Sequence, residues 1–177
     1  MTAVEILPLL DSAFVELFDR DCALFTLGTS GISEQTLTFR LGHYLQQRFE
    51  KHHVDCEYNR FEDKLKNDIY VDQEWMKPDV IIHWRTKKEQ NLLVVEAKKA
   101  GQWEGGWAST SQKLEAFTRQ PGKYEYRLGL AWQISESQDP RTHLGAWFRK
   151  GTEICRTRIY DFVTEVQTNI KAQDGAS

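Results

Sequence analysis

The sequence PDVIIH at residues 78–83 is followed, after a polar turn, by LLVVEAK at residues 92–98. Both segments are short, apolar and rich in β-branched residues, which predicts two neighbouring strands. Side chains two residues apart in a strand share a face, so Glu96 and Lys98 should point the same way. Asp79 would bring a second carboxylate close to Glu96. Two adjacent carboxylates repel each other unless a cation lies between them, and oxygen ligands suit Mg²⁺ or Mn²⁺.

The position of these charges favours a functional site over an ordinary surface pair. A Glu and a Lys two apart on a strand usually form a solvated ion pair worth less than about 1 kcal/mol. Pro78-Asp79 alone is a common turn dipeptide. However, residues 92–95 are apolar on both faces, which predicts a central strand where unpaired charges are costly. We therefore interpret Asp79, Glu96 and Lys98 together as a metal site.

Pro78-Asp79 and Glu96-Ala97-Lys98, with an amphipathic helix before them and a helical segment after them, resemble the PD-(D/E)xK nuclease superfamily. The wider pattern at residues 55–60, 113–114 and 124–126 is similar to a group of small uncharacterised bacterial members, and the resemblance spans about residues 34 to 132. It implies an α/β, restriction-endonuclease-like fold with a mixed central β-sheet of about five strands flanked by α-helices. It also implies hydrolysis of phosphodiester bonds with Mg²⁺ or Mn²⁺, with DNA favoured over RNA.

The resemblance also assigns roles to individual residues. Asp79, Glu96 and the Ala97 carbonyl would hold the ion, and Lys98 would position or deprotonate the attacking water. Glu34 matches a helix glutamate that binds a second ion or the water. Glu34 also lies on the apolar stripe of its predicted helix, where a buried carboxylate needs a cation or a donor. The alternative for Glu34 is a first-turn acid that complements the helix dipole.

Other polar and aromatic residues near the motif have weaker signals. Gln112 and Lys113 follow the motif in a region where related proteins place auxiliary polar groups, but a solvated helix face is the favoured interpretation. Trp103 and Trp107 could stack on a base or wedge a duplex open, but covering the edge of the core is favoured. His83 is expected to be a hydrogen-bonded structural residue.

Length and composition predict one globular unit. The chain has 177 residues, of which 40% are hydrophobic and 12% aromatic. We expect a single domain over residues 1–177, with N-terminal helices at 1–51, the catalytic sheet and helices at 52–171, and a frayed tail at 172–177. No apolar run approaches the roughly 18 residues of a membrane span, and the N-terminus lacks a signal pattern. A cytoplasmic protein without membrane attachment is expected. Three widely separated cysteines imply neither a disulfide nor a zinc site.

The net charge of −3 limits the expected affinity for nucleic acid. Proteins that coat DNA are usually basic, although a metal site also attracts phosphate. We expect nucleic acid as the partner, with modest affinity or with a protein partner or a second copy of the chain assisting. Two alternatives stay open: a catalytically silent nuclease-fold module that binds nucleic acid or protein, and hydrolysis of another substrate such as a nucleotide.

Hydrophobic periodicity predicts the remaining elements. The predicted helices cover residues 4–19, the segment after the N-cap Ser33 up to about residue 51, 110–118 and 158–171. The predicted strands cover residues 53–60, 78–85, 91–98, 124–134 and 143–149. The predicted loops and turns cover residues 61–77, 86–90, 98–108 and 135–142.

Overall fold

A computed structural model describes residues 1–25, 33–58, 60–61, 64–65, 70–71, 74–75, 77–85 and 87–176. Its helices are α1 (Ala3–Asp21), α2 (Glu34–Arg48), α3 (Ala100–Thr118) and α4 (Phe162–Gly175). The strands of its main sheet are β1 (His53–Cys56), β6 (Val80–His83), β7 (Leu93–Lys99), β8 (Leu128–Ile134), β9 (Leu144–Arg149) and β10 (Thr152–Arg158). The short strands are β2 (Arg60–Phe61), β3 (Lys64–Leu65), β4 (Tyr70–Val71) and β5 (Glu74–Trp75), and the 3₁₀ segments are Cys22–Phe25, Lys88–Gln90 and Pro140–Thr142.

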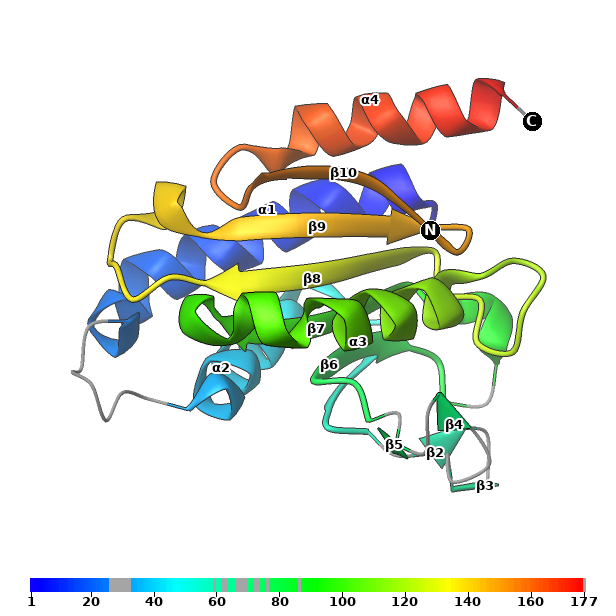
Figure 1. Cartoon of the computed structure of the whole chain (residues 1–177), viewed down its shortest axis with the longest axis horizontal. Coiled ribbons are helices and arrows are strands. Elements are labelled where there is room, and N and C mark those ends of the chain that lie inside the picture. The colour runs from blue at the N-terminus through cyan, green and yellow to red at the C-terminus, as the bar shows by residue number, and fades with distance from the viewer. Residues whose placement is uncertain are drawn as a thin grey trace.

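The main sheet is mixed and has helices on both faces. Its strand order is β1-β6-β7-β8-β9-β10, and only the β7–β8 pair is parallel. Figure 1 shows α3 crossing in front of the sheet, with α1 and α2 behind it and α4 beside β10. The α/β class predicted from the sequence is confirmed. The sheet has six strands where about five were expected, because β10 was not predicted.

The alternation of side chains divides the core into two clusters, one on each face of the sheet. Ile82 and Val95 belong to the larger cluster, which contains the buried faces of α1, α2 and α4. Ile81 and Val94 belong to the smaller cluster under α3. The two central strands are therefore buried on both faces, as their continuous apolar runs predict.

The two N-terminal helices follow the predicted pattern. The apolar stripe of α1 is buried, and α2 begins at Glu34 with Ser33 as its N-cap. The Ser33 Oγ accepts a hydrogen bond from the Thr36 N–H at 3.2 Å. This cap fixes where the helix starts, so it also fixes the position of Glu34 at the first turn.

The prediction of a loop over residues 98–108 is wrong, because α3 already starts at Ala100. Trp103 and Trp107, one helical turn apart, pack against the smaller core cluster and continue the buried stripe that ends with Leu114 and Phe117. The glycines that suggested a loop are mostly on the outer side, where Gly105 has open space around its α-carbon. Burial of the aromatic residues outweighs the roughly 1 kcal/mol that each helical glycine costs.

The strand β10 was not predicted from the sequence, and it forms a hairpin with β9. Lys150 (φ 53°) and Gly151 (φ 78°) adopt the left-handed conformations that a two-residue hairpin turn requires. The strand is polar and lies at the edge of the sheet, so it lacks the apolar alternation of a buried strand. The last helix consequently starts at Phe162 instead of Arg158, and it continues to Gly175, beyond the predicted end at residue 171.

Other element boundaries differ by a few residues. The helix α2 ends at Arg48 instead of residue 51. The first strand ends at Cys56 instead of Arg60, because Glu57 has a φ of 51° that takes the chain out of the strand. In the predicted loop over residues 61–77, the described residues include the short antiparallel pairs β2–β3 and β4–β5. The other residues of that loop, apart from residue 77, and Thr86 of the predicted hairpin connection lie outside the described residues.

Close packing of α3 on the sheet depends on Gly129 in β8. A Cβ at this position would lie 3.0 Å from Thr118 Cγ2 of α3 and 3.2 Å from Phe148 Cβ of β9. We predict that Gly129→Val lowers the free energy of unfolding by about 1–3 kcal/mol, because the neighbours must move apart. The midpoint of urea denaturation measures this effect.

Gly105→Ala is the matched control, because a Cβ there meets nothing within 4 Å. It should raise the free energy of unfolding by about 0.5–1 kcal/mol through helix propensity alone. If Gly129→Val were as stable as the wild-type protein, α3 would not pack closely on β8.

Candidate active site

Asp79 and Glu96 lie side by side where the pairing of β6 with β7 ends. The antiparallel register joins Val80 to Val95, so Asp79, one residue before β6, comes opposite Glu96. Both side chains belong to the face of the sheet that α3 covers. The Asp79 Oδ2 accepts a hydrogen bond from the Ala97 N–H at 2.7 Å. The structure thus brings together the two acids that were predicted to hold the ion.

Glu34 reaches the same point from the opposite layer of the molecule. Its Oε1 accepts a hydrogen bond from the Lys99 N–H at 2.7 Å, and its Oε2 lies 3.4 Å from the Lys98 Nζ. These contacts bridge residues that are more than sixty positions apart in sequence. Glu34 therefore faces the motif, as its place on the apolar stripe predicted, and is not directed to bulk water.

Lys98 is surrounded by negative charge. Burial alone would lower the pKa of its ammonium, but the carboxylates of Glu34, Asp79 and Glu96 outweigh burial, and the pKa is raised. Lys98 is consequently a cation at neutral pH. In this arrangement it can attract and orient an anion or a water molecule. To deprotonate a water, Lys98 would first have to lose its own proton, which the surrounding carboxylates oppose.

The pKa of Asp79 is also raised, which for an acid means that its charged form is disfavoured. Burial raises the pKa of its carboxyl group, and the charge of Glu34 raises it further. The hydrogen bond from Ala97 and the positive charges of Lys98 and Lys113 lower the pKa without restoring its ordinary value. The ionised form of Asp79 is therefore incompletely compensated by its neighbours.

Lys113 supplies a second ammonium group that sequence analysis did not favour. Its Nζ lies 3.8 Å from the Glu96 Oε2, and the Glu96 side chain is only 3% exposed. Lys113 thus turns toward the sheet, and its interpretation as part of a solvated face is wrong. Gln112, the preceding residue of α3, is exposed as expected. Lys113 lies three residues after the buried Thr110 and four before the buried Phe117, and this spacing on one helix face was the available signal that Lys113 points inward.

The tryptophans and His83 have structural contacts. Trp103 and Trp107 pack on each other, with ring centroids 5.0 Å apart, and against the smaller core cluster. The His83 Nε2 lies 2.8 Å from the Asp55 Oδ2, and Arg85 binds the same carboxylate. These observations agree with the interpretations favoured from the sequence.

The chemistry of the site suits a divalent cation, although the side chains do not already form a coordination shell. Within the described residues, no three Asp, Glu, His or Cys side chains are grouped closely enough to hold a metal ion. Asp79 and Glu34 instead accept backbone N–H groups. Three carboxylates nevertheless share the region with two ammonium groups, and the raised pKa of Asp79 reflects a buried acid that an added cation would stabilise.

We predict that Asp79→Asn raises the melting temperature at pH 7 in the absence of divalent ions. The pKa of Asp79 is raised in the folded state, so this group contributes most stability at acidic pH and loses that contribution as the pH rises through its folded pKa. Asparagine is neutral and keeps an oxygen acceptor for the Ala97 N–H. A rise on the order of 2–4 °C is expected, the shift that about 1 kcal/mol produces in a chain of this size. The difference should shrink at acidic pH.

Asp55→Asn is the matched control with the opposite sign. Burial would raise the pKa of Asp55, but hydrogen bonds from His83 and Arg85 outweigh burial and lower it strongly. Asp55 therefore contributes stability above its unfolded pKa and loses it as the pH falls through its folded pKa. Thermal unfolding across a pH series should show Asp55→Asn less stable than wild type at pH 7. A fall in melting temperature for Asp79→Asn as well would mean that the Asp79 charge is fully compensated.

None of the helices in the described residues is both long and apolar enough to cross a bilayer. A comparison of the chain with models of protein families, with curated protein sequences and with solved structures finds no match in any of the three.

Proposed function

We propose that the protein is a metal-dependent phosphodiesterase, a nuclease that uses Mg²⁺ or Mn²⁺. The observation that carries this proposal is the convergence of Glu34, Asp79 and Glu96 on Lys98. These residues come from three separate segments of the chain, and two of the three acids are held by backbone N–H groups. Perturbed, partly buried charges of both signs at one point are typical of catalytic sites.

We also infer a restriction-endonuclease-like fold. The support is the position of the motif: Asp79 just before β6, Glu96 and Lys98 at the end of the central strand β7, with α2 before them and α3 after them. Ligands commonly bind beyond strand ends in α/β sheets. The parallel crossover from β7 through α3 to β8 brings the helix over this end of the sheet.

Asp79, Glu96 and the Ala97 carbonyl would hold the metal ion. In a regular strand, the N–H and C=O of one residue point to the same side. Because the Ala97 N–H points to Asp79, its carbonyl is expected on that side as well. Glu34 would contribute to a second ion or to the water network. A bound ion would supply charge neutralisation for the phosphate and acidify the attacking water.

The lysines of the site would orient the substrate and position the acids. Lys98, as an ammonium, would orient the scissile phosphate or the water that attacks phosphorus. The attacking water would lose a proton to solvent, the P–O bond to its oxygen would form as the bond to the leaving oxygen breaks, and the leaving oxygen would take up a proton from solvent. The negative charge on the phosphate oxygens would face Lys98. Lys113 would hold Glu96 in position through their 3.8 Å ion pair. DNA is the preferred substrate in this proposal, with RNA as the alternative, on the basis of the family resemblance alone.

Replacing Lys98 should separate catalysis from metal binding. We predict that Lys98→Ala reduces Mn²⁺-dependent cleavage by at least about 10²-fold. Its affinity for Mn²⁺ should be equal or higher, because an ammonium group cannot ligate a cation and competes for the carboxylates. Asp79→Ala and Glu96→Ala should lose both properties. Calorimetric Mn²⁺ titrations and cleavage of labelled single-stranded, double-stranded and branched DNA and of RNA measure the two effects.

Lys99→Ala is the control, because it removes the same charge from the neighbouring residue, whose side chain points to the other face of β7. It should retain both cleavage and Mn²⁺ binding. Equal cleavage by wild type and Lys98→Ala would point to a contaminant or a different mechanism. Mn²⁺ binding without cleavage of any substrate by the wild type would favour the silent module.

Glu34→Gln tests the acid that comes from the helical layer. Glutamine keeps an oxygen acceptor for the Lys99 N–H but removes the charge beside Lys98. We predict weaker Mn²⁺ binding and at least about tenfold slower cleavage, with a melting temperature close to that of wild type. The same titration and cleavage assays apply. If Mn²⁺ affinity and cleavage rate were both unchanged, the role of Glu34 would be limited to accepting the Lys99 N–H, and the site would reduce to Asp79, Glu96 and Lys98.

A further inference from the structure

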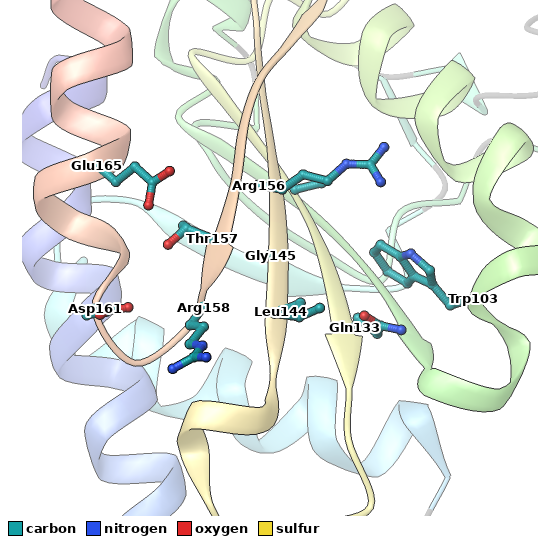
Figure 2. A pocket seen from close by; sticks show the side chains of 10 residues that line it. Trp103, Gln133, Leu144, Gly145, Arg156, Thr157, Arg158, Asp161 and Glu165 are labelled. Carbon is teal, nitrogen blue, oxygen red and sulfur yellow. The ribbon is translucent and has the colours of Figure 1, made fainter.

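A pocket of about 420 Å³ lies beside the ends of β8, β9 and β10, between the N-terminal parts of α3 and α4. Figure 2 shows Trp103 on its α3 side, and Gln133, Leu144, Arg156 and Arg158 on the strands. The proposed catalytic residues do not line this pocket. It is large enough for a ligand of nucleotide size.

The pocket continues the face of the sheet that carries the catalytic lysine. In the register, Lys98 pairs with Gln133, Gln133 with Leu144, and Leu144 with Arg158. Paired residues in adjacent strands project to the same face. Three strand spacings of about 4.8 Å put the backbone of Arg158 roughly 14 Å from that of Lys98. A row of side chains thus leads from the proposed active site to Arg158.

The two arginines of β10 differ in how they are held. Arg156 binds Glu153 with its Nε 2.6 Å from the Oε1, and its guanidinium lies 4.1 Å from the ring centroid of Trp107. Arg158 is exposed, and within the described part of the chain it forms no ion pair or hydrogen bond through its side chain. Hydrogen bonds to its carboxylate are the main cause of the lowered pKa of Asp139, and the charge of Arg158 lowers it further. The Arg158 guanidinium has no direct contact with that carboxylate and can still bind an external anion. Arg156 lines the pocket but is held in place by Glu153 and Trp107.

We propose that this pocket binds a single-stranded segment of a nucleic acid as it leaves the active site. This inference rests on the proposed nuclease function and extends it to the substrate. Arg158 would bind a backbone phosphate. Trp103 packs on Trp107 and the core but is only half-buried, and the open part of its ring would stack on an unpaired base. The pocket is lined mainly by β8, β9 and β10, with Trp103 at its α3 side. An unpaired base could reach this ring, whereas the stacked bases of a duplex would not.

Acidic residues limit the path of this strand. Asp161 and Glu165 line the pocket on the side of α4, opposite Trp103 (Figure 2). Their carboxylates repel phosphate, so the backbone would pass between Trp103 and Arg158 and would not extend toward α4. The asymmetric charge of the pocket therefore restricts the phosphate backbone to the side of Arg158 that faces Trp103.

The test measures binding of fluorescein-labelled single-stranded DNA, single-stranded RNA and duplex DNA by fluorescence anisotropy, in EDTA and over a series of salt concentrations. Arg158→Gln should weaken binding about tenfold, the effect of one charge-assisted hydrogen bond, whatever the base sequence. The slope of log K against log salt concentration should fall by about 0.7, the value for one phosphate contact on a single strand. Arg158→Lys should restore most of the slope.

Arg119→Gln is the matched control, because it removes the same charge from the exposed C-cap of α3, at the opposite end of that helix from Trp103. It should leave affinity and slope unchanged. Equal effects of the two substitutions, no effect of Arg158→Gln, or a loss confined to duplex DNA would overturn the proposal, as would a wild-type protein that binds no single strand. Because these measurements are made without divalent ions, they are independent of cleavage: absence of Mn²⁺-dependent cleavage would count against the proposed function alone.

Discussion

The hydrogen bond from the Ala97 N–H to the Asp79 carboxylate is the contact on which the site depends. It forms where β6 stops pairing with β7, so a side chain takes over the role of a backbone acceptor. Glu34 does the same for the Lys99 N–H, two residues further along β7. Asp79 and Glu34 therefore supply acceptors for N–H groups of β7 that lie beyond its pairing with β6. Their backbone role fixes them beside Glu96 and Lys98, which keeps the charged groups together without a bound ion.

This arrangement has an electrostatic cost that the fold alone does not explain. A neutral amide could accept the Ala97 N–H as well as a carboxylate does, yet Asp79 is buried next to the negative charge of Glu34, and its pKa is raised. Lys98 of β7 and Lys113 of α3 offset part of this charge. Binding a divalent cation is the role that we propose for this charge.

The sequence predicted those parts of the molecule in which one strong pattern dominates. The β6 and β7 strands follow from their continuous apolar runs, and the orientation of Glu34 follows from its place on an apolar helical stripe. The helical start of α3 could not be predicted from local propensity, because burial of Trp103 and Trp107 overrides their glycine-rich surroundings. The inward direction of Lys113 likewise depends on how α3 packs over Glu96, which is a tertiary property.

The central claim is that Asp79, Glu96 and the Ala97 carbonyl hold a divalent ion. Its most direct test is a crystal structure of the protein with Mn²⁺, in which an anomalous difference map locates the metal. We predict an anomalous peak at about 2.0–2.2 Å from a carboxylate oxygen of Asp79, one of Glu96 and the Ala97 carbonyl oxygen, which are distances typical of small divalent ions. A crystal at saturating Mn²⁺ with no peak at this position, or with peaks only at surface carboxylates such as Asp174, would contradict it.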